Sequence, residues 1–136
     1  MNISEVMSRN VRITSPEDTL QHAAQMMKDI DAGVLPVGEN DRLVGMLTDR
    51  DITVRAVALG KVPDTCVREV MSPDIKYVYD DESLEDAARN MGELQVRRLP
   101  VLNRDKKLVG IVSLGDVALR KKDTAGEALK EVSEPS

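Results

Sequence analysis

Two stretches of the sequence place a hydroxyl side chain and a carboxylate at the same spacing. Residues 45–52 read GMLTDRDI and residues 110–117 read GIVSLGDV. Each stretch contains a hydroxyl residue followed by an aspartate, and the two pairs are Thr48 with Asp51 and Ser113 with Asp116. If a helix begins at the hydroxyl residue, its open end attracts an anion. The carboxylate can then accept hydrogen bonds from a ribose diol while a phosphate lies near the helix N–H groups.

The same spacing also has a purely structural interpretation. A Ser or Thr at the start of a helix, with an acidic residue three positions later, forms a capping box that needs no ligand. Because capping boxes are common, the spacing alone favours this interpretation. A second line of argument is needed to favour a ligand site.

The two stretches belong to a longer internal repeat. A repeat of this length indicates a duplicated supersecondary unit of about 60 residues. The matching segments are ISEVMS (3–8) with VREVMS (67–72), LPV (35–37) with LPV (99–101), and LVG (43–45) with LVG (108–110). We therefore expect a first unit at 1–60, a connector at 61–66, a second unit at 67–122 and a polar tail at 123–136.

Each copy contains the elements that would position its hydroxyl and carboxylate. In the first copy, Ser15 is expected to cap a helix with Pro16 at its first position and Asp18 three residues after the cap. The apolar stripe of that helix is Leu20, Ala23, Ala24, Met27 and Ile30. A hairpin at 35–37 and 43–47 and a helix at 49–59 should follow. The corresponding elements of the second copy are expected at 84–94, 99–102, 108–112 and from Leu114 onward.

The composition of the chain limits its class. With 136 residues, 41% of them apolar and 32% charged, it can fill a core. The net charge of −5 makes nucleic acid an improbable partner. Neither a membrane span nor a signal peptide is evident, so we expect a cytoplasmic protein. The single cysteine, Cys66, excludes an internal disulfide but leaves a bridge between two chains open.

The order of these motifs in both copies resembles the CBS-domain family, and the resemblance extends from Ile3 to about Lys121. The chain looks like a stand-alone tandem CBS pair, often called a Bateman module. The resemblance implies an α/β (α+β) fold with two units of β-α-β-β-α type packed through their sheets with pseudo-two-fold symmetry. Similar proteins are regulatory sensors. They bind AMP, ADP, ATP, other adenine nucleotides or S-adenosylmethionine in the clefts between the two units.

The resemblance also implies roles for individual residues. It assigns ribose binding to Asp51 and Asp116, with the adjacent hydroxyls on Thr48 and Ser113. Arg97 and Arg98 stand where basic residues often meet phosphates, whereas the first copy has Gly33 and Val34 there. The residues that would contact the base, from the strand before the first helix of each copy, are Ile13, Thr14, Ser15, Pro16, Tyr77, Val78, Tyr79 and Asp80.

Two other functions remain open alternatives. The first is an interaction module without a ligand, which acts through its dimer surface. The second is an enzyme, which the sequence favours least: the chain lacks a phosphate-binding loop and a nucleophile elbow, and His22 has no evident nucleophile to serve, so we do not expect an enzyme. No required cofactor or metal site is expected, since His22 has no second His or Cys cluster beside it.

We also expect a homodimer, because the second helix of each copy carries apolar residues that its own unit does not obviously cover. These residues are Val54, Val57, Ala58, Val117 and Leu119. The regulated protein would be a separate chain, which the sequence does not identify. The sequence also does not select among AMP, ATP, NAD and S-adenosylmethionine as the ligand.

Overall fold

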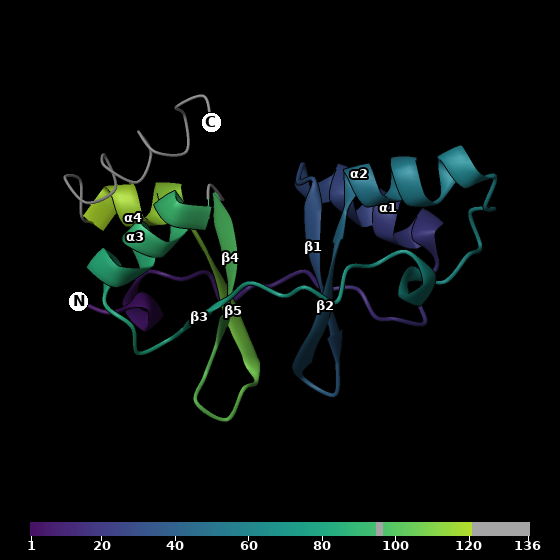
Figure 1. The fold of residues 1–136 in the computed structure, drawn as a ribbon. Coiled ribbons are helices and arrows are strands. Elements are labelled where there is room, and N and C mark those ends of the chain that lie inside the picture. Colours follow the sequence, from purple (N-terminus) through teal and green to yellow (C-terminus); the bar gives the residue numbers. More distant parts are fainter. Residues whose placement is uncertain (95–96, 121–136) are drawn as a thin grey trace. The chain divides into compact units, whose positions relative to one another are not determined.

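The computed structural model describes residues 1–94 and 97–120, so the expected polar tail at 123–136 lies outside the described residues. The chain forms two compact units (Figure 1). The central unit is Arg12–Ile75, and the terminal unit combines Met1–Val11 with the residues from Lys76 onward. Among the described residues, no helix is long and apolar enough to cross a bilayer.

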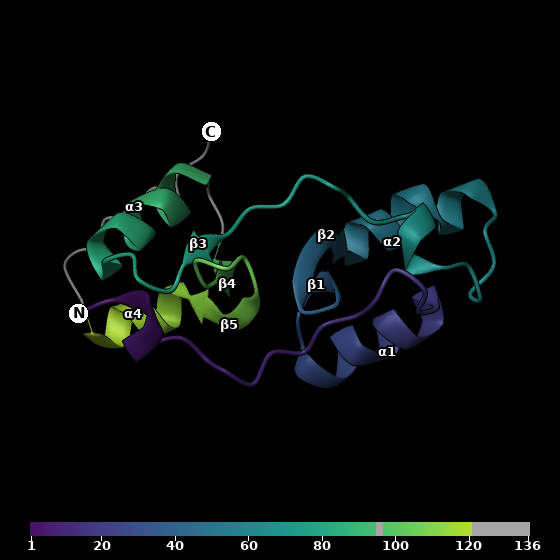
Figure 2. The ribbon, with the colours of Figure 1, turned by 90° about the horizontal axis from the view of Figure 1, so that it is seen from below.

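The central unit is an antiparallel hairpin with two helices on the same side of it (Figures 1 and 2). Its turn residues Asn40 and Asp41 both have positive φ, as a tight hairpin turn requires. The predicted hairpin is thereby confirmed. The elements are α1 (Leu20–Ile30), β1 (Val34–Glu39), β2 (Arg42–Thr48), α2 (Asp49–Arg55) and the 3-10 turns η2 (Val57–Leu59) and η3 (Val67–Glu69).

Helix α1 begins later than the sequence predicted. Thr19, and not Ser15, is its N-cap, and the Thr19 hydroxyl accepts a hydrogen bond from the His22 N–H. Ser15 instead accepts the Asp18 N–H through its carbonyl, in a turn before the helix. The prediction of Ser15 as the cap was wrong because the Asp18 carboxylate accepts hydrogen bonds from the Thr14 hydroxyl and the Thr19 N–H and does not close a box with Ser15.

The apolar stripe of α1 differs from the prediction at one position. Ala24 is exposed, and Met26 takes its place among the buried residues. The core of the central unit is formed by α1, the hairpin and the segment after the connector. Its buried members are Leu20, Ala23, Met26, Met27, Leu35, Val37, Leu47, Ala56, Val67 and Val70.

The terminal unit contains a three-stranded sheet in the order β3-β4-β5, with β3 parallel and β5 antiparallel to β4. The predicted helix at 84–94 is confirmed, and so is the hairpin that follows it. The elements are η1 (Ile3–Glu5), β3 (Val78–Tyr79), α3 (Leu84–Leu94), β4 (Arg98–Leu102), β5 (Leu108–Ser113) and α4 (Leu114–Arg120). The mixed sheets and helices make this an α+β fold, as expected.

The strand expected at 13–16 is reduced to a single bridge. Only Thr14 pairs with the hairpin, in parallel to Val37. Its N–H donates to the Pro36 carbonyl at 3.1 Å, and its carbonyl accepts the Gly38 N–H at 2.9 Å. Pro16 has no N–H to donate, so the ladder does not extend through it.

The opening segment of each sequence copy packs on the hairpin of the other copy. Ser8 pairs with Ile111 through hydrogen bonds of 2.8 and 2.9 Å, and Ser72 pairs with Met46 through bonds of 2.8 and 2.9 Å. Gly110 permits the first contact, because a Cβ there would lie 2.8 Å from the Ser8 carbonyl oxygen. The compact units are therefore offset from the sequence repeat by these exchanged segments.

Candidate functional site

In the central unit, Thr48 and Asp51 form a reciprocal pair where β2 meets α2. The Asp51 N–H donates to Thr48 Oγ1 at 3.0 Å, and the Thr48 N–H donates to Asp51 Oδ2 at 3.0 Å. Thr48 is extended, with φ −111° and ψ 160°, as an N-cap residue should be. The capping box predicted from the spacing is thus present.

The terminal unit repeats this arrangement where β5 meets α4. The Asp116 N–H donates to Ser113 Oγ at 3.1 Å, and the Ser113 N–H donates to Asp116 Oδ2 at 3.1 Å. Asp51 and Asp116 are both half-buried. The two copies therefore hold their carboxylates with the same pair of reciprocal hydrogen bonds.

The capping box uses only one oxygen of each carboxylate. Oδ2 accepts the cap N–H, while Oδ1 of Asp51 and of Asp116 accepts no hydrogen bond from any described residue. An ionised carboxylate has room for about four hydrogen bonds on its two oxygens. The structural interpretation and the ligand interpretation are therefore compatible, because the box fixes a carboxylate whose second oxygen is free.

The start of the preceding strand lies beside each capping box. In the terminal unit, Arg98 pairs with Ser113 in the ladder, and the Leu114 N–H donates to the Arg97 carbonyl at 2.9 Å. Both arginines are exposed and form no ion pair with a described residue. Arg97 and Arg98 thus lie next to Ser113 and Leu114, at the start of the helix that carries Asp116.

In the central unit, Gly33 and Val34 take the places of these arginines. Val34 pairs with Thr48, and the Asp49 N–H donates to the Gly33 carbonyl at 2.9 Å. The Asp49 side chain turns back over this point. Its Oδ1 accepts the Arg50 N–H at 2.8 Å, and its Oδ2 would lie 2.9 Å from a Cβ placed on Gly33.

Sequence reasoning did not single out Asp49 as part of this site. The available signal was the difference between DRD at 49–51 and LGD at 114–116. Leu114 in the terminal unit is buried, at 6% exposure, whereas Asp49 is exposed. The first helical position after the hydroxyl residue is therefore acidic in the central unit and apolar in the terminal unit.

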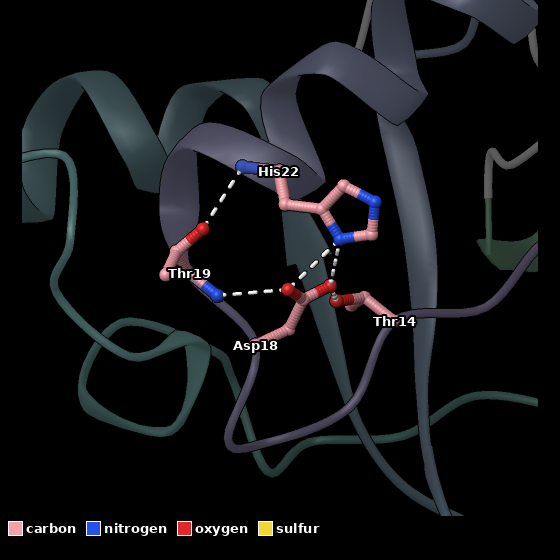
Figure 3. A network of polar contacts seen from close by, with 4 residues as sticks. All are labelled: Thr14, Asp18, Thr19 and His22. Carbon is pink, nitrogen blue, oxygen red and sulfur yellow. Dashed lines mark hydrogen bonds and ion pairs between the residues drawn. The ribbon is translucent and has the colours of Figure 1, made fainter.

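A polar network fixes the expected base-contact segment of the central unit (Figure 3). Thr14 is buried, and its hydroxyl donates to Asp18 Oδ2 at 2.9 Å. The Thr19 N–H donates to Asp18 Oδ1 at 2.9 Å, and His22 Nδ1 lies 2.7 Å from Asp18 Oδ2. Ile13 and Ser15 are exposed beside this network.

The network changes the acidity of Asp18. Burial by itself raises the pKa of this carboxyl, but the hydrogen bonds from Thr14, His22 and Thr19 together outweigh burial and lower the pKa below its usual 3.8. Asp18 is therefore held as a carboxylate whose acceptor positions are filled by the protein.

The terminal unit has aromatic residues in the corresponding segment. The rings of Tyr77 and Tyr79 meet edge to face with centroids 5.5 Å apart, and the Arg104 guanidinium lies 4.0 Å from the Tyr79 ring centre. Two hydrogen bonds of 2.8 Å join Arg104 to Asp81, and the hydrogen bond from Arg104 lowers the pKa of Asp81. One face of the Tyr79 ring is thus already in contact with a cation.

The expected binding residues of the terminal unit divide between the two ends of β4. Tyr79 pairs with Leu102, and the Asp80 N–H donates to the carbonyl of that residue at 2.9 Å. Arg98 and Ser113 lie at the other end of the strand. The structure groups the arginines with the Ser113 pair and does not group them with Tyr79.

Glu82 is a second residue that sequence reasoning missed. It occupies the place of Asp18, and its Oε1 accepts the Tyr79 N–H at 3.3 Å. Its Oε2 is buried and has no hydrogen-bond partner in the described part of the chain. Val78, which is buried, stands where the central unit has Thr14, so the hydroxyl donor is missing.

An apolar groove of about 200 Å³ lies between α1, α2 and the connector of the central unit. Two of its lining residues, Val57 and Val62, are 67% and 61% exposed, and the nearby residue Leu59 in the same 3-10 turn as Val57 is 70% exposed. Val54 and Ala58 are also exposed, as the expected dimer surface requires. Val117 contradicts that expectation, because it is fully buried in the core of its own unit, and the side chain of Leu119 lies outside the described residues.

Across residues 1–94 and 97–120, no group of three or more His, Cys, Asp or Glu side chains is arranged to hold a metal ion. His22 faces the single carboxylate of Asp18, and Cys66 is half-buried and free. The donor set needed for a protein-bound zinc is therefore missing from this part of the chain.

Comparison with known proteins gives a consistent result. The CBS domain profile matches residues 3–57 and 67–123. The CBS domain-containing protein YhcV of Bacillus subtilis is 42% identical over 134 residues, which is 97% of this chain and 95% of that protein.

Two solved structures with the same fold contain bound groups. Hypoxic Response Protein I with two coordinated zinc ions has a TM-score of 0.77 and 39% identity, and the match covers 88% of this chain and 98% of that chain. CBSX2 in complex with AMP has a TM-score of 0.75 and 29% identity, with coverage of 90% and 96%.

Proposed function

Because the chain belongs to the CBS-domain family, we propose that it is a non-catalytic regulatory sensor that binds adenosine-containing ligands in the cytoplasm. Each unit contributes one half-site. The central half-site consists of Thr48, Asp51 and the segment Ile13–Pro16. The terminal half-site consists of Ser113, Asp116, the segment Tyr77–Asp80 and the basic pair Arg97 and Arg98.

The observation that carries this proposal is that Oδ1 of Asp51 and Oδ1 of Asp116 accept no hydrogen bond from the described residues. A half-buried carboxylate whose backbone bonds hold it in place loses little conformational entropy when a ribose hydroxyl binds. A ligand role for this chain is also supported by a similar structure, because CBSX2 has been crystallised in complex with AMP. AMP, ADP, ATP and S-adenosylmethionine are the ligands to be compared.

The proposal is tested by thermal shift and calorimetry with adenosine and AMP on the wild-type chain and on Asp116→Ala and Asp51→Ala. Ligand at about 100 times its Kd should raise stability by about 2.7 kcal/mol. Each alanine variant should lose one binding event, because the ribose hydroxyls are left unpaired. The variants Asp116→Asn and Asp51→Asn serve as controls that keep one acceptor oxygen. If Asp116→Ala lowers the melting temperature without changing affinity, the carboxylate acts only as a cap.

A second candidate function rests on the exposed apolar groove of the central unit. Val54, Val57, Leu59 and Val62 present apolar side chains to solvent, and such surfaces mark interaction sites. We propose that this surface forms a homodimer contact, which an interaction module without a ligand would share. Sedimentation at micromolar concentration should give a dimer, and Val57→Asp should shift it toward monomer. A wild-type particle of 15.0 kDa would contradict the dimer.

A further inference from the structure

Tyr77 and Tyr79 are the only tyrosines of a chain that contains no Trp and no Phe. Val78 stands between them, is 1% exposed and belongs to the core of the terminal unit. Both tyrosines are half-buried and lie outside that core. Because alternate residues of an extended segment point to opposite sides, the two rings share the side that faces away from the core.

The Arg104 guanidinium covers the Tyr79 ring, with its central carbon 4.0 Å from the ring centre. Asp81 holds the guanidinium at its edge, because Nε and Nη2 of Arg104 each donate to a carboxylate oxygen of Asp81 at 2.8 Å. Such paired bonds lie in the guanidinium plane. The Arg104 side chain is 62% exposed. The face of the guanidinium opposite Tyr79 is therefore open to a partner.

A planar aromatic group suits this open face better than an anion does. An aromatic ring can stack on the guanidinium while both bonds to Asp81 stay intact. An anion would instead bind at the guanidinium edge, close to the Asp81 carboxylate and to its acidic neighbours Asp80 and Glu82. Like charges placed together in this way oppose binding. The cluster therefore favours an aromatic ring.

The source of such a ring is best sought in a different protein. A second copy of this chain offers only the same two tyrosines, and a nucleotide would bring its phosphate into the acidic surroundings of Arg104. Tyrosine and arginine are also the residue types that dominate the energetic centres of protein interfaces. The central unit has Ile13 and Ser15 at the corresponding positions, so only the terminal unit carries this cluster.

We propose that Tyr77, Tyr79 and Arg104 form a docking surface for a different protein, which places a Trp, Tyr or Phe side chain on the open face of the guanidinium. The surface lies at the Leu102 end of β4. The capping box of the terminal unit lies at the Arg98 end, four residues or about 13 Å away along the strand. The inference therefore goes beyond the proposed function, and docking requires no nucleotide.

The test is a titration of the wild-type chain with the peptide acetyl-Gly-Trp-Gly-amide, followed by NMR through the tyrosine ring resonances. The peptide should shift the Tyr79 ring resonances to saturation. The peptide acetyl-Gly-Leu-Gly-amide has the same backbone without a ring and should bind about threefold to tenfold more weakly. Arg104→Lys keeps the charge but removes the plane, and it should weaken binding of the Trp peptide by a similar factor.

Arg89→Lys is the matched control, because Arg89 is 63% exposed and pairs with Asp86 in the same unit at 3.2 Å, with no aromatic ring beneath it among the described residues. It should leave the affinity for the Trp peptide unchanged, and so should Asp116→Ala. Equal affinity for the two peptides, unchanged affinity in Arg104→Lys or no saturable shift would overturn the docking surface. A stronger shift of the Tyr79 ring by AMP than by the Trp peptide would also overturn it. Failure of AMP and adenosine to bind would overturn the proposed function alone.

Discussion

The two half-sites are alike in their backbone and unlike in their charge. Both carry a reciprocal capping box, with hydrogen bonds of 3.0 Å in the central unit and 3.1 Å in the terminal unit. Beside the box, one unit has Asp49 over Gly33 and the other has exposed arginines. The capping box constrains only the hydroxyl and the carboxylate, so the neighbouring positions are free to change ligand preference.

The acid before the first helix differs in a second way. Asp18 receives hydrogen bonds from Thr14 and Thr19, whereas Glu82 has a buried oxygen with no partner among the described residues. The copies differ here at three corresponding positions, because Thr14, Asp18 and His22 of the central unit correspond to Val78, Glu82 and Asp86 of the terminal unit. A repeat can therefore preserve a fold while leaving a buried polar group satisfied in one copy only.

The largest expected effect on stability comes from truncating one buried leucine in the core of a unit. Leu84→Ala should destabilise the terminal unit and Leu20→Ala the central unit, each by about 2–5 kcal/mol, because both side chains are buried. The free energy of unfolding of each variant is measured by urea denaturation. Leu59→Ala, at a side chain that is 70% exposed, is the control and should stay within about 0.5 kcal/mol of wild type.

The glycines under the exchanged segments should give the next largest effect. A Cβ at Gly110 would lie 2.8 Å from the Ser8 carbonyl oxygen, and one at Gly45 would lie 2.9 Å from the Ser72 carbonyl oxygen. Alanine at either position should cost about 1–3 kcal/mol, since the segment must move away. Gly115→Ala is the matched control, because its Cβ would meet nothing closer than 3.5 Å. Wild-type stability of Gly110→Ala would contradict the packing of the exchanged segment.

The difference between Asp18 and Glu82 can be reversed by substitution. Val78→Thr supplies a hydroxyl donor to Glu82 and should raise the free energy of unfolding by about 1 kcal/mol. Thr14→Val removes the donor from Asp18 and should lower stability by a similar or larger amount. Equal destabilisation by both variants, measured by thermal unfolding, would show that the missing hydroxyl is not what leaves Glu82 unsatisfied.

The smallest effect on stability is expected from lowering the pH until Asp18 is protonated. Because the pKa of Asp18 lies below 3.8 in the folded state, its carboxylate stabilises the central unit above that pH. The contribution is lost as the pH falls through the lower pKa of the folded state. Asp18→Asn should therefore flatten the fall in the urea midpoint below pH 3.8. Asp81→Asn should change it less, since Asp81 and Arg104 are both exposed and such pairs contribute little.

Much of this arrangement is predictable from local sequence. The helix at Leu84–Leu94, both hairpins and both capping boxes follow from apolar periodicity and from the spacing of hydroxyl and acid. The start of α1 is not predictable in this way, because Ser15 and Thr19 are both good caps. Which of the two residues caps the helix depends on the hydrogen bonds of Asp18. Its carboxylate binds the Thr14 and His22 side chains and the Thr19 N–H.

The exchange of the opening segments lies beyond what a repeat can reveal. ISEVMS and VREVMS are equally compatible with either hairpin, and pairing of Ser8 with Ile111 is a contact between copies. The position of Asp49 over Gly33 is likewise a tertiary contact, since it joins the start of β1 to the first turn of α2. The hairpin register places the start of β1 next to the start of α2, but the sequence pattern does not fix the direction in which the Asp49 side chain turns.

Calorimetry comparing AMP with adenosine on the wild-type chain, Asp51→Ala and Asp116→Ala tests the inequality of the half-sites most directly. A charged hydrogen bond contributes about 1.5–3 kcal/mol, so AMP should bind the terminal half-site about tenfold to a hundredfold more tightly than the central one. The tighter AMP event should vanish in Asp116→Ala and survive in Asp51→Ala, while adenosine shows much less preference. Equal AMP affinities, or a tight event that survives Asp116→Ala and vanishes with Asp51→Ala, would contradict the assignment of Arg97 and Arg98 as phosphate ligands.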